Sequence, residues 1–146
     1  MNTDTKSNVE KLNEFLSNEL AAVETYQQCI DKTSGSVTAP RLRELRQSHA
    51  ARAEQLRERI MALGGEPVKS SGAWGSFAKT VEGGAKMFSE QAALAILEEG
   101  EDKGLADYRK DLDKLEESSR SFVASALLPE QQRSHDQLRR IIGERG

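Results

Sequence analysis

Apolar residues recur along this chain in steps of three and four, the spacing that places side chains on one face of an α-helix. Such stripes cover four segments, at about residues 7–31, 40–63, from near 89 to 115, and from 118 or 119 to 143. Pro129 falls inside the last segment, and because proline lacks the N–H that an inner helical turn needs, we expect a kink or a break there. The pattern predicts an all-α chain of four long helices.

The connections indicate how these helices are arranged. Residues 33–37 form a link so short that the second helix must run antiparallel to the first. Gly64 and Gly65 end the second helix, and the connection up to residue 88 is long enough to cross the whole bundle. Within this crossover a short helix is predicted from the spacing of Trp74, Phe77, Ala78 and Val81. We therefore predict a disordered N-terminus over residues 1–6 and one domain over residues 7–146, an antiparallel four-helix bundle of two hairpins.

Composition narrows the function classes. The formal net charge is −3, so no overall positive field favours nucleic acid. No apolar run approaches the ~20 residues of a membrane span, and no signal-like segment opens the chain. Cys29 is the single cysteine, which excludes a disulfide framework and fits a reducing compartment. We expect a cytoplasmic protein that binds neither nucleic acid nor a membrane.

Each predicted inward stripe also carries polar residues that an apolar core would reject. They are Glu19 in the first helix, His49 in the second, Glu101 in the third, and Gln132 with His135 in the fourth. For the fourth helix the full predicted stripe is Phe122, Ser125, Leu128, Gln132, His135, Leu138 and Ile142. Because an isolated buried carboxylate is costly, each Glu should be paired, protonated or bound to a metal ion.

These polar residues repeat between the two halves of the chain. Tyr26 follows Glu19 by seven residues, as Tyr108 follows Glu101, and both histidines follow a serine. Two carboxylates and two imidazoles that converge in mid-bundle form a plausible site for a divalent transition metal. The tyrosines have two interpretations: they support the metal ligands, or they are core residues that hydrogen-bond a carboxylate.

Four short motifs resemble a bacterial group of ferritin-like proteins of unknown function. They are Asn-Glu-Leu-Ala-Ala-Val-Glu-Thr-Tyr at 18–26, Leu-Gly-Gly-Glu-Pro at 63–67, Ser-Gly-Ala-Trp-Gly at 71–75 and Glu-Gly-Glu at 99–101. The wider pattern, over about residues 9–142, resembles rubrerythrin and other ferritin-like di-iron proteins. Such proteins hold metal with a carboxylate on two helices and a Glu-x-x-His motif on each of the other two.

This resemblance implies a metal site that has lost part of its ligand set. Glu19 and Glu101 match the single carboxylates, and His49 and His135 match the histidines. The partner glutamates are replaced by Arg46 and by Gln132, each three residues before its histidine, and Glu98 is a candidate substitute ligand.

Two functions follow from these residues. In the first, the protein binds a divalent metal, with iron as the first expectation and zinc or manganese as alternatives. The resemblance then implies iron oxidation or peroxide handling, although the substrate and enzymatic activity stay open. In the second, the metal is absent, Arg46 replaces the cation, and the bundle is a structural or protein-interaction module. In either case we expect a homodimer. The direction of Arg46 should discriminate between them, because an inward guanidinium disfavours metal.

Overall fold

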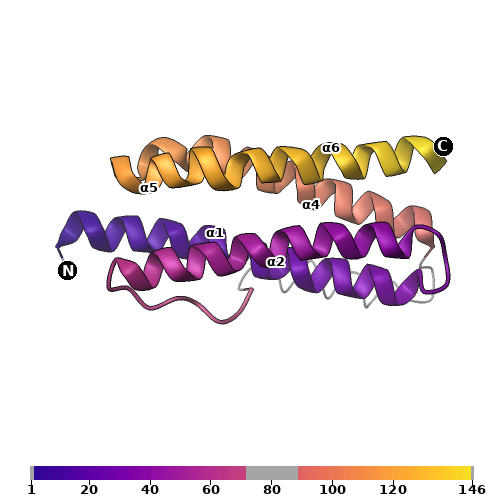
Figure 1. The fold of residues 1–146 in the computed structure, drawn as a ribbon, viewed down its shortest axis with the longest axis horizontal. Helices are drawn as coiled ribbons and strands as arrows, with labels where there is room; N and C mark the ends of the chain where they lie inside the picture. The colour runs from indigo at the N-terminus through magenta and orange to yellow at the C-terminus, as the bar shows by residue number, and fades with distance from the viewer. Residues whose placement is uncertain (1, 72–88, 146) are drawn as a thin grey trace.

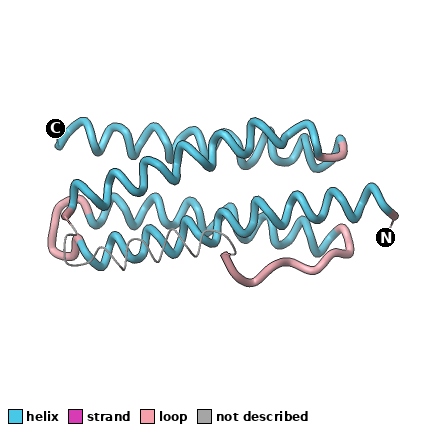
Figure 2. The backbone as a smooth tube through the Cα atoms, turned by 180° about the vertical axis from the view of Figure 1, so that it is seen from behind, coloured by secondary structure: helices cyan, strands magenta, loops and turns pink. Residues whose placement is uncertain are grey.

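The computed structural model describes residues 2–71 and 89–145, and every regular element in these ranges is helical (Figures 1 and 2). The elements are α1 (Thr3–Lys32), α2 (Ala39–Ala62), α4 (Glu90–Asp111), the 3₁₀ turn η3 (Leu112–Lys114), α5 (Glu117–Phe122), the π-helical turn η4 (Val123–Leu127) and α6 (Leu128–Arg145). The predicted all-α class is confirmed. The predicted crossover helix at Trp74, Phe77, Ala78 and Val81 lies outside the described residues.

Figure 1 shows the helices as two hairpins lying side by side. α1 packs most extensively on α2, and α4 on α6, while contacts between α1 and α4 join the hairpins. The backbones of α2 and α6 come less close together than those of the two helices within either hairpin. α2 ends and α4 begins at opposite ends of the bundle (Figure 1).

The ends of the helices follow local capping chemistry. α4 begins as predicted, because the Ser89 side chain accepts a hydrogen bond from the Ala92 N–H at 3.1 Å. Gly64, with φ of +83°, follows the end of α2. α1 differs from the prediction. It starts at Thr3, within the stretch expected to be disordered, because the Asn2 side chain caps it by accepting from the Thr5 N–H at 2.7 Å.

The last helix departs most from its prediction. Instead of a break at Pro129, the chain forms the π-helical turn η4 immediately before it, and the Leu128 N–H bonds the Val123 carbonyl five residues back. A π turn takes up more residues than an α turn. The buried positions consequently step by four, through Ser119, Val123, Leu127 and Gln131. The predicted stripe assumed α-helical steps throughout. It is confirmed at His135 and Leu138, which are buried, but it was wrong at Ser125, which is exposed, and at Gln132, because Gln131 is the buried glutamine.

The core consists of two apolar clusters separated by a polar layer. One cluster surrounds Leu12, Leu16 and Leu56, and the other surrounds Ile30, Leu42 and Leu138. Glu19 and Glu101, which are 3% and 2% exposed, lie between them. Among the described helices, none is long and apolar enough to cross a bilayer. The fold thus isolates a small group of charged side chains from water.

Candidate functional site

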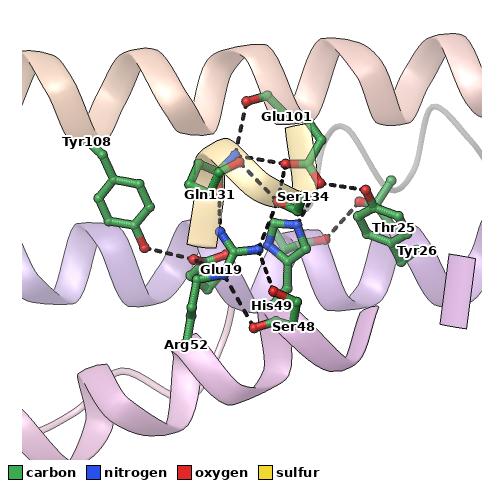
Figure 3. A network of polar contacts seen from close by, with 11 residues as sticks. Glu19, Thr25, Tyr26, Ser48, His49, Arg52, Glu101, Tyr108, Gln131 and Ser134 are labelled. Atoms are coloured by element: carbon green, nitrogen blue, oxygen red, sulfur yellow. Dashed lines mark hydrogen bonds and ion pairs between the residues drawn. The ribbon is translucent and has the colours of Figure 1, made fainter. Parts of the chain in front are cut away.

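A histidine bridge connects the two hairpins at the polar layer (Figure 3). His49 of α2 places Nδ1 2.6 Å from Glu19 Oε1 and Nε2 2.8 Å from Glu101 Oε2. All three side chains are buried. An imidazolium can donate from both ring nitrogens, so protonated His49 satisfies a carboxylate on each side. Three of the four predicted metal ligands, Glu19, His49 and Glu101, therefore come together, but the imidazole ring of His49 lies between the two carboxylates.

The two tyrosines reach across between the hairpins. The Tyr26 hydroxyl of α1 donates to Glu101 Oε2 at 2.5 Å, and the Tyr108 hydroxyl of α4 donates to Glu19 Oε2 at 2.7 Å. Seven residues are about two helical turns, so each Tyr lies on the same face of its helix as the Glu but about two turns away from it. Its hydroxyl therefore bonds the Glu of the other hairpin and not the Glu of its own helix. The structure brings both tyrosines to the centre as hydrogen-bond donors to carboxylates.

Arg52 is a central residue that the sequence analysis missed. Its side chain is 1% exposed, and its Nε lies 3.4 Å from Glu19 Oε2. Its terminal nitrogens donate to Gln131 Oε1, to Ser134 Oγ at 3.1 Å and to Ser48 Oγ at 3.4 Å. Its burial could have been predicted from its position, because Arg52 follows His49 by three residues and so lies on the same inward side of α2.

On the opposite side, Glu101 receives neutral donors from α6. The Gln131 side chain donates to Glu101 Oε1 at 2.9 Å and to the Glu101 carbonyl at 3.0 Å, and Ser134 donates to Oε1 at 2.8 Å. Gly104 makes this possible, because a Cβ at that position would lie 2.8 Å from Gln131 Nε2. Each carboxylate is therefore held by one Tyr of the other hairpin, by His49, and by further residues of α2 or α6.

The two halves of the centre are related by a constant offset in sequence. Equivalent residues stand 82 positions apart, as Glu19 and Glu101, Tyr26 and Tyr108, His49 and Gln131, and Arg52 and Ser134. Core leucines follow the same offset, as Leu45 and Leu127, and Leu56 and Leu138. The residue equivalent to His49 is thus Gln131, whereas the repeated Ser-His dipeptide had suggested His135.

The remaining predicted residues lie away from the carboxylate pair. His135 Nε2 is 2.6 Å from Asp102 Oδ1, and its Nδ1 is 3.3 Å from Asp136. The Gln132 side chain accepts from Arg109 at 2.7 Å, and Glu98 lies 3.8 Å from Arg139. The inward cation is Arg52, while Arg46 donates to Gln27.

The charges of the centre balance one another. Burial alone would raise the pKa of Glu19, but Arg52 and His49 hold it below its ordinary value. Burial likewise opposes ionisation of Glu101, and His49 lowers its pKa overall. For His49, burial disfavours the charge, but Glu101 and Glu19 raise its pKa above the ordinary value. Two carboxylates therefore face one imidazolium and one guanidinium.

A small cavity adjoins this network. It measures about 20 Å³ and is lined by both glutamates, both tyrosines and His49, with Ala22 and Gly100 among the small residues beside them. A volume of this size holds about one water molecule. The centre is therefore nearly filled by its own side chains.

This donor set does not fit a metal ion. The nitrogens of His49 face two different carboxylates from opposite sides of the ring, so one ion cannot take all three groups as they stand. In the part of the chain that the structure describes, no group of three His, Cys, Asp or Glu side chains is placed to share a metal. The guanidinium of Arg52 also places a fixed positive charge beside Glu19.

Comparison with known proteins yields one match. No curated protein and no solved structure matches the chain. A family model matches residues 7–114, a range that includes most of α1 and all of α2 and α4, and therefore Glu19, His49, Arg52 and Glu101. Gln131 and Ser134 lie beyond the matched range. Because the match covers well over half of the chain, the chain belongs to the family described as a domain of unknown function, DUF2383.

Proposed function

We propose that this chain is a ferritin-like, antiparallel four-helix bundle that works without a metal ion, as a structural or protein-interaction module. The two hairpins, and the end of α2 and the start of α4 at opposite ends of the bundle, support the ferritin-like arrangement. The polar centre is then the former position of the metal site, with its function changed.

The observation that carries this proposal is the buried guanidinium of Arg52. Di-iron proteins of this fold use a Glu-x-x-His motif on two of the helices. In the two helices that the 82-residue offset pairs here, the side chains that reach the centre are instead His49 and Arg52 of α2, and Gln131 and Ser134 of α6. These four residues supply one imidazole and one cation in place of two carboxylates and two imidazoles. Since a divalent ion beside Arg52 would be repelled in a medium of low dielectric constant, the arrangement favours a metal-free centre.

A metal-free network of this kind can define how helices pair. The centre ties α1, α2, α4 and α6 together through buried hydrogen bonds whose partners are fixed in register. Buried polar networks are known to specify register without adding to net stability. We propose that the network keeps the two similar hairpins in a single alignment, so that the outer surface presents one defined shape.

We propose a second copy of the chain as the partner of this module. Large apolar side chains are scarce on the described surface, where Val37, Met61 and Val68 are the exposed ones. The sequence of the connection between α2 and α4 contains four large apolar residues, Trp74, Phe77, Met87 and Phe88. Light scattering on the wild type and on a Trp74→Ser/Phe77→Ser variant tests this. A dimer mass lost in the variant supports the homodimer, and a monomeric wild type overturns it.

Metal content tests the central claim. The untagged protein would be purified without chelator, loaded anaerobically with Fe(II), desalted and measured by mass spectrometry, beside a His49→Ala variant treated identically. We expect only trace metal in both. A stoichiometric metal in the wild type that disappears in His49→Ala would overturn the proposal. It would favour the metal-binding alternative, for which the meeting of Glu19, His49 and Glu101 is the supporting observation.

A further inference from the structure

The guanidinium of Arg52 is enclosed by oxygen atoms from three helices. Glu19 of α1 contributes a carboxylate oxygen at 3.4 Å from Nε, and Gln131 of α6 contributes its amide oxygen. Hydroxyl oxygens come from Ser134 at 3.1 Å and Ser48 at 3.4 Å, and the Ser48 carbonyl lies 3.3 Å from Nε. We call these five acceptors the guanidinium cage.

The cage has the geometry of a planar cation rather than of a metal site. Its acceptors lie around all three nitrogens of the guanidinium, Nε and both terminal nitrogens, at hydrogen-bond distances (Figure 3). A metal ion would instead need oxygens converging on one point at about 2.0–2.6 Å. The single carboxylate supplies one negative charge, which matches a monovalent cation.

The cage also joins the two hairpins at the centre of the bundle. The backbones of α2 and α6 come less close together than those of α1 and α2, and Arg52 extends from α2 to two residues of α6. The same side chain contacts Glu19 on α1. A ligand in this position therefore links both hairpins.

We propose that the cage is a binding site for guanidinium compounds whose resident ligand is the side chain of Arg52. When that side chain is truncated, a small free guanidinium cation takes its place and restores the link between the hairpins. This inference rests on the proposed function in one respect, since it treats the centre as built for an organic cation and not for a metal.

Chemical rescue of an Arg52→Ala variant tests this inference. Its melting temperature would be followed by circular dichroism with guanidinium chloride at millimolar concentrations, well below the denaturing range. Sodium chloride controls for ionic strength, and urea serves as a neutral planar analogue. Arg59→Ala is the matched variant, because Arg59 is on the same helix but contacts Ser118 and Ser119 of α5, away from the guanidinium cage.

We expect guanidinium to raise the melting temperature of Arg52→Ala by about 2–5 °C and to leave Arg59→Ala and the wild type unchanged or slightly lowered. Adding Gln131→Ala to Arg52→Ala should abolish the rise. The absence of a rise in a folded Arg52→Ala variant, or an equal rise with urea, would overturn the inference.

Two further measurements distinguish a failure of the guanidinium cage from a failure of the proposed metal-free function. Zn²⁺ binding to Arg52→Ala without any response to guanidinium would overturn the cage, while the metal content of the wild type independently decides the proposed function. If Arg52→Ala does not fold, Arg52→Lys replaces it, because lysine keeps the charge but lacks the planar fork. Arg52→Lys should then melt below the wild type, and an equal melting temperature would overturn the inference.

Discussion

The two carboxylates of the centre occupy equivalent positions but have different neighbours. Glu19 is held by an ionic neighbour on α2, Arg52, whereas Glu101 is held by the neutral side chains of Gln131 and Ser134 on α6. His49 bonds both carboxylates, although it belongs to the first hairpin alone. The same backbone arrangement thus supports an ionic half and a hydrogen-bonded half.

This difference explains how the core remains neutral. One arginine and one imidazolium balance two carboxylates, so a second arginine at position 134 would leave an unpaired positive charge. The cost of an unpaired charge in a low-dielectric interior is several kcal/mol. Because His49 bonds both carboxylates and Arg52 supplies the second positive charge, neutral donors are sufficient on the α6 side.

The largest expected difference in the free energy of unfolding is between His49→Ala and Gln131→Ala, which change equivalent positions in the two halves. His49→Ala leaves two buried carboxylates without their shared cation, and we expect a loss of about 3–5 kcal/mol in the free energy of unfolding. Gln131→Ala, at the equivalent position, removes a neutral side chain that bonds the Glu101 carboxylate and the Arg52 guanidinium, and about 1–3 kcal/mol is expected. Urea denaturation measures both. Equal losses would mean that the ionic and neutral halves do not differ energetically.

Changing pH should remove the His49 charge without removing the side chain, with a smaller effect. Around His49 lie Glu19 and Tyr26 of α1, Glu101 of α4 and Arg52 of α2. Because the folded-state pKa of His49 is raised, its contribution is complete below its ordinary pKa of about 6.5. It declines as pH rises from there through the folded-state pKa, since the unfolded chain has already lost the proton.

Glu19 and Glu101 determine how stability changes on the acidic side of the same pH dependence. Their pKa values are lowered in the folded state, so their contribution is present above the ordinary value of 4.5 and is lost as pH falls. Stability should therefore be greatest between about pH 4.5 and 6.5. Denaturation curves across pH 4–9 should show a decline on the alkaline side that is absent in His49→Gln. An equal alkaline decline in that variant would assign it to other groups.

The fold was more predictable from sequence than the composition of its centre. Periodicity located α2 and α4 well because their buried residues follow α-helical steps and local caps, such as Ser89, mark where they begin. Glu19, His49 and Glu101 were identified because a charged residue in an apolar stripe is conspicuous. The phase of the last helix was not predictable in the same way, since the π turn before Pro129 changes the period locally.

Arg52 was missed for a different physical reason. Arginine in a helix of this composition is normally solvated, and sequence cannot show that acceptors from α1 and α6 converge on one of the many arginines of α2. The equivalence of His49 with Gln131 was likewise hidden, because it depends on a constant offset that the misleading Ser-His dipeptide contradicts. The three-dimensional contacts identify Arg52, and they draw attention to the offset that pairs His49 with Gln131.

A final, smaller contrast concerns Gly104, the glycine that admits Gln131. Alanine in a helix interior normally adds up to about 1 kcal/mol of stability over glycine. At Gly104 the new Cβ would lie 2.8 Å from Gln131 Nε2 and 3.2 Å from its Cδ, and Gln131 is confined between Arg52 and Glu101. We therefore expect Gly104→Ala to destabilise the fold by about 1 kcal/mol, because the lost hydrogen bonds outweigh the gain in propensity.

Gly143 provides the control for this substitution, because nothing lies within 4 Å of a Cβ at that helical position. Gly143→Ala should be neutral or stabilising, opposite in sign to Gly104→Ala. In a Gln131→Ala background the obstruction is gone, so Gly104→Ala should lose its penalty and show the helix-propensity gain alone. A penalty that persists there would place the strain elsewhere than Gln131. Its disappearance would show that the neutral half depends on one close approach between α4 and α6, which the ionic half, with Ala22 at the equivalent position, does not require.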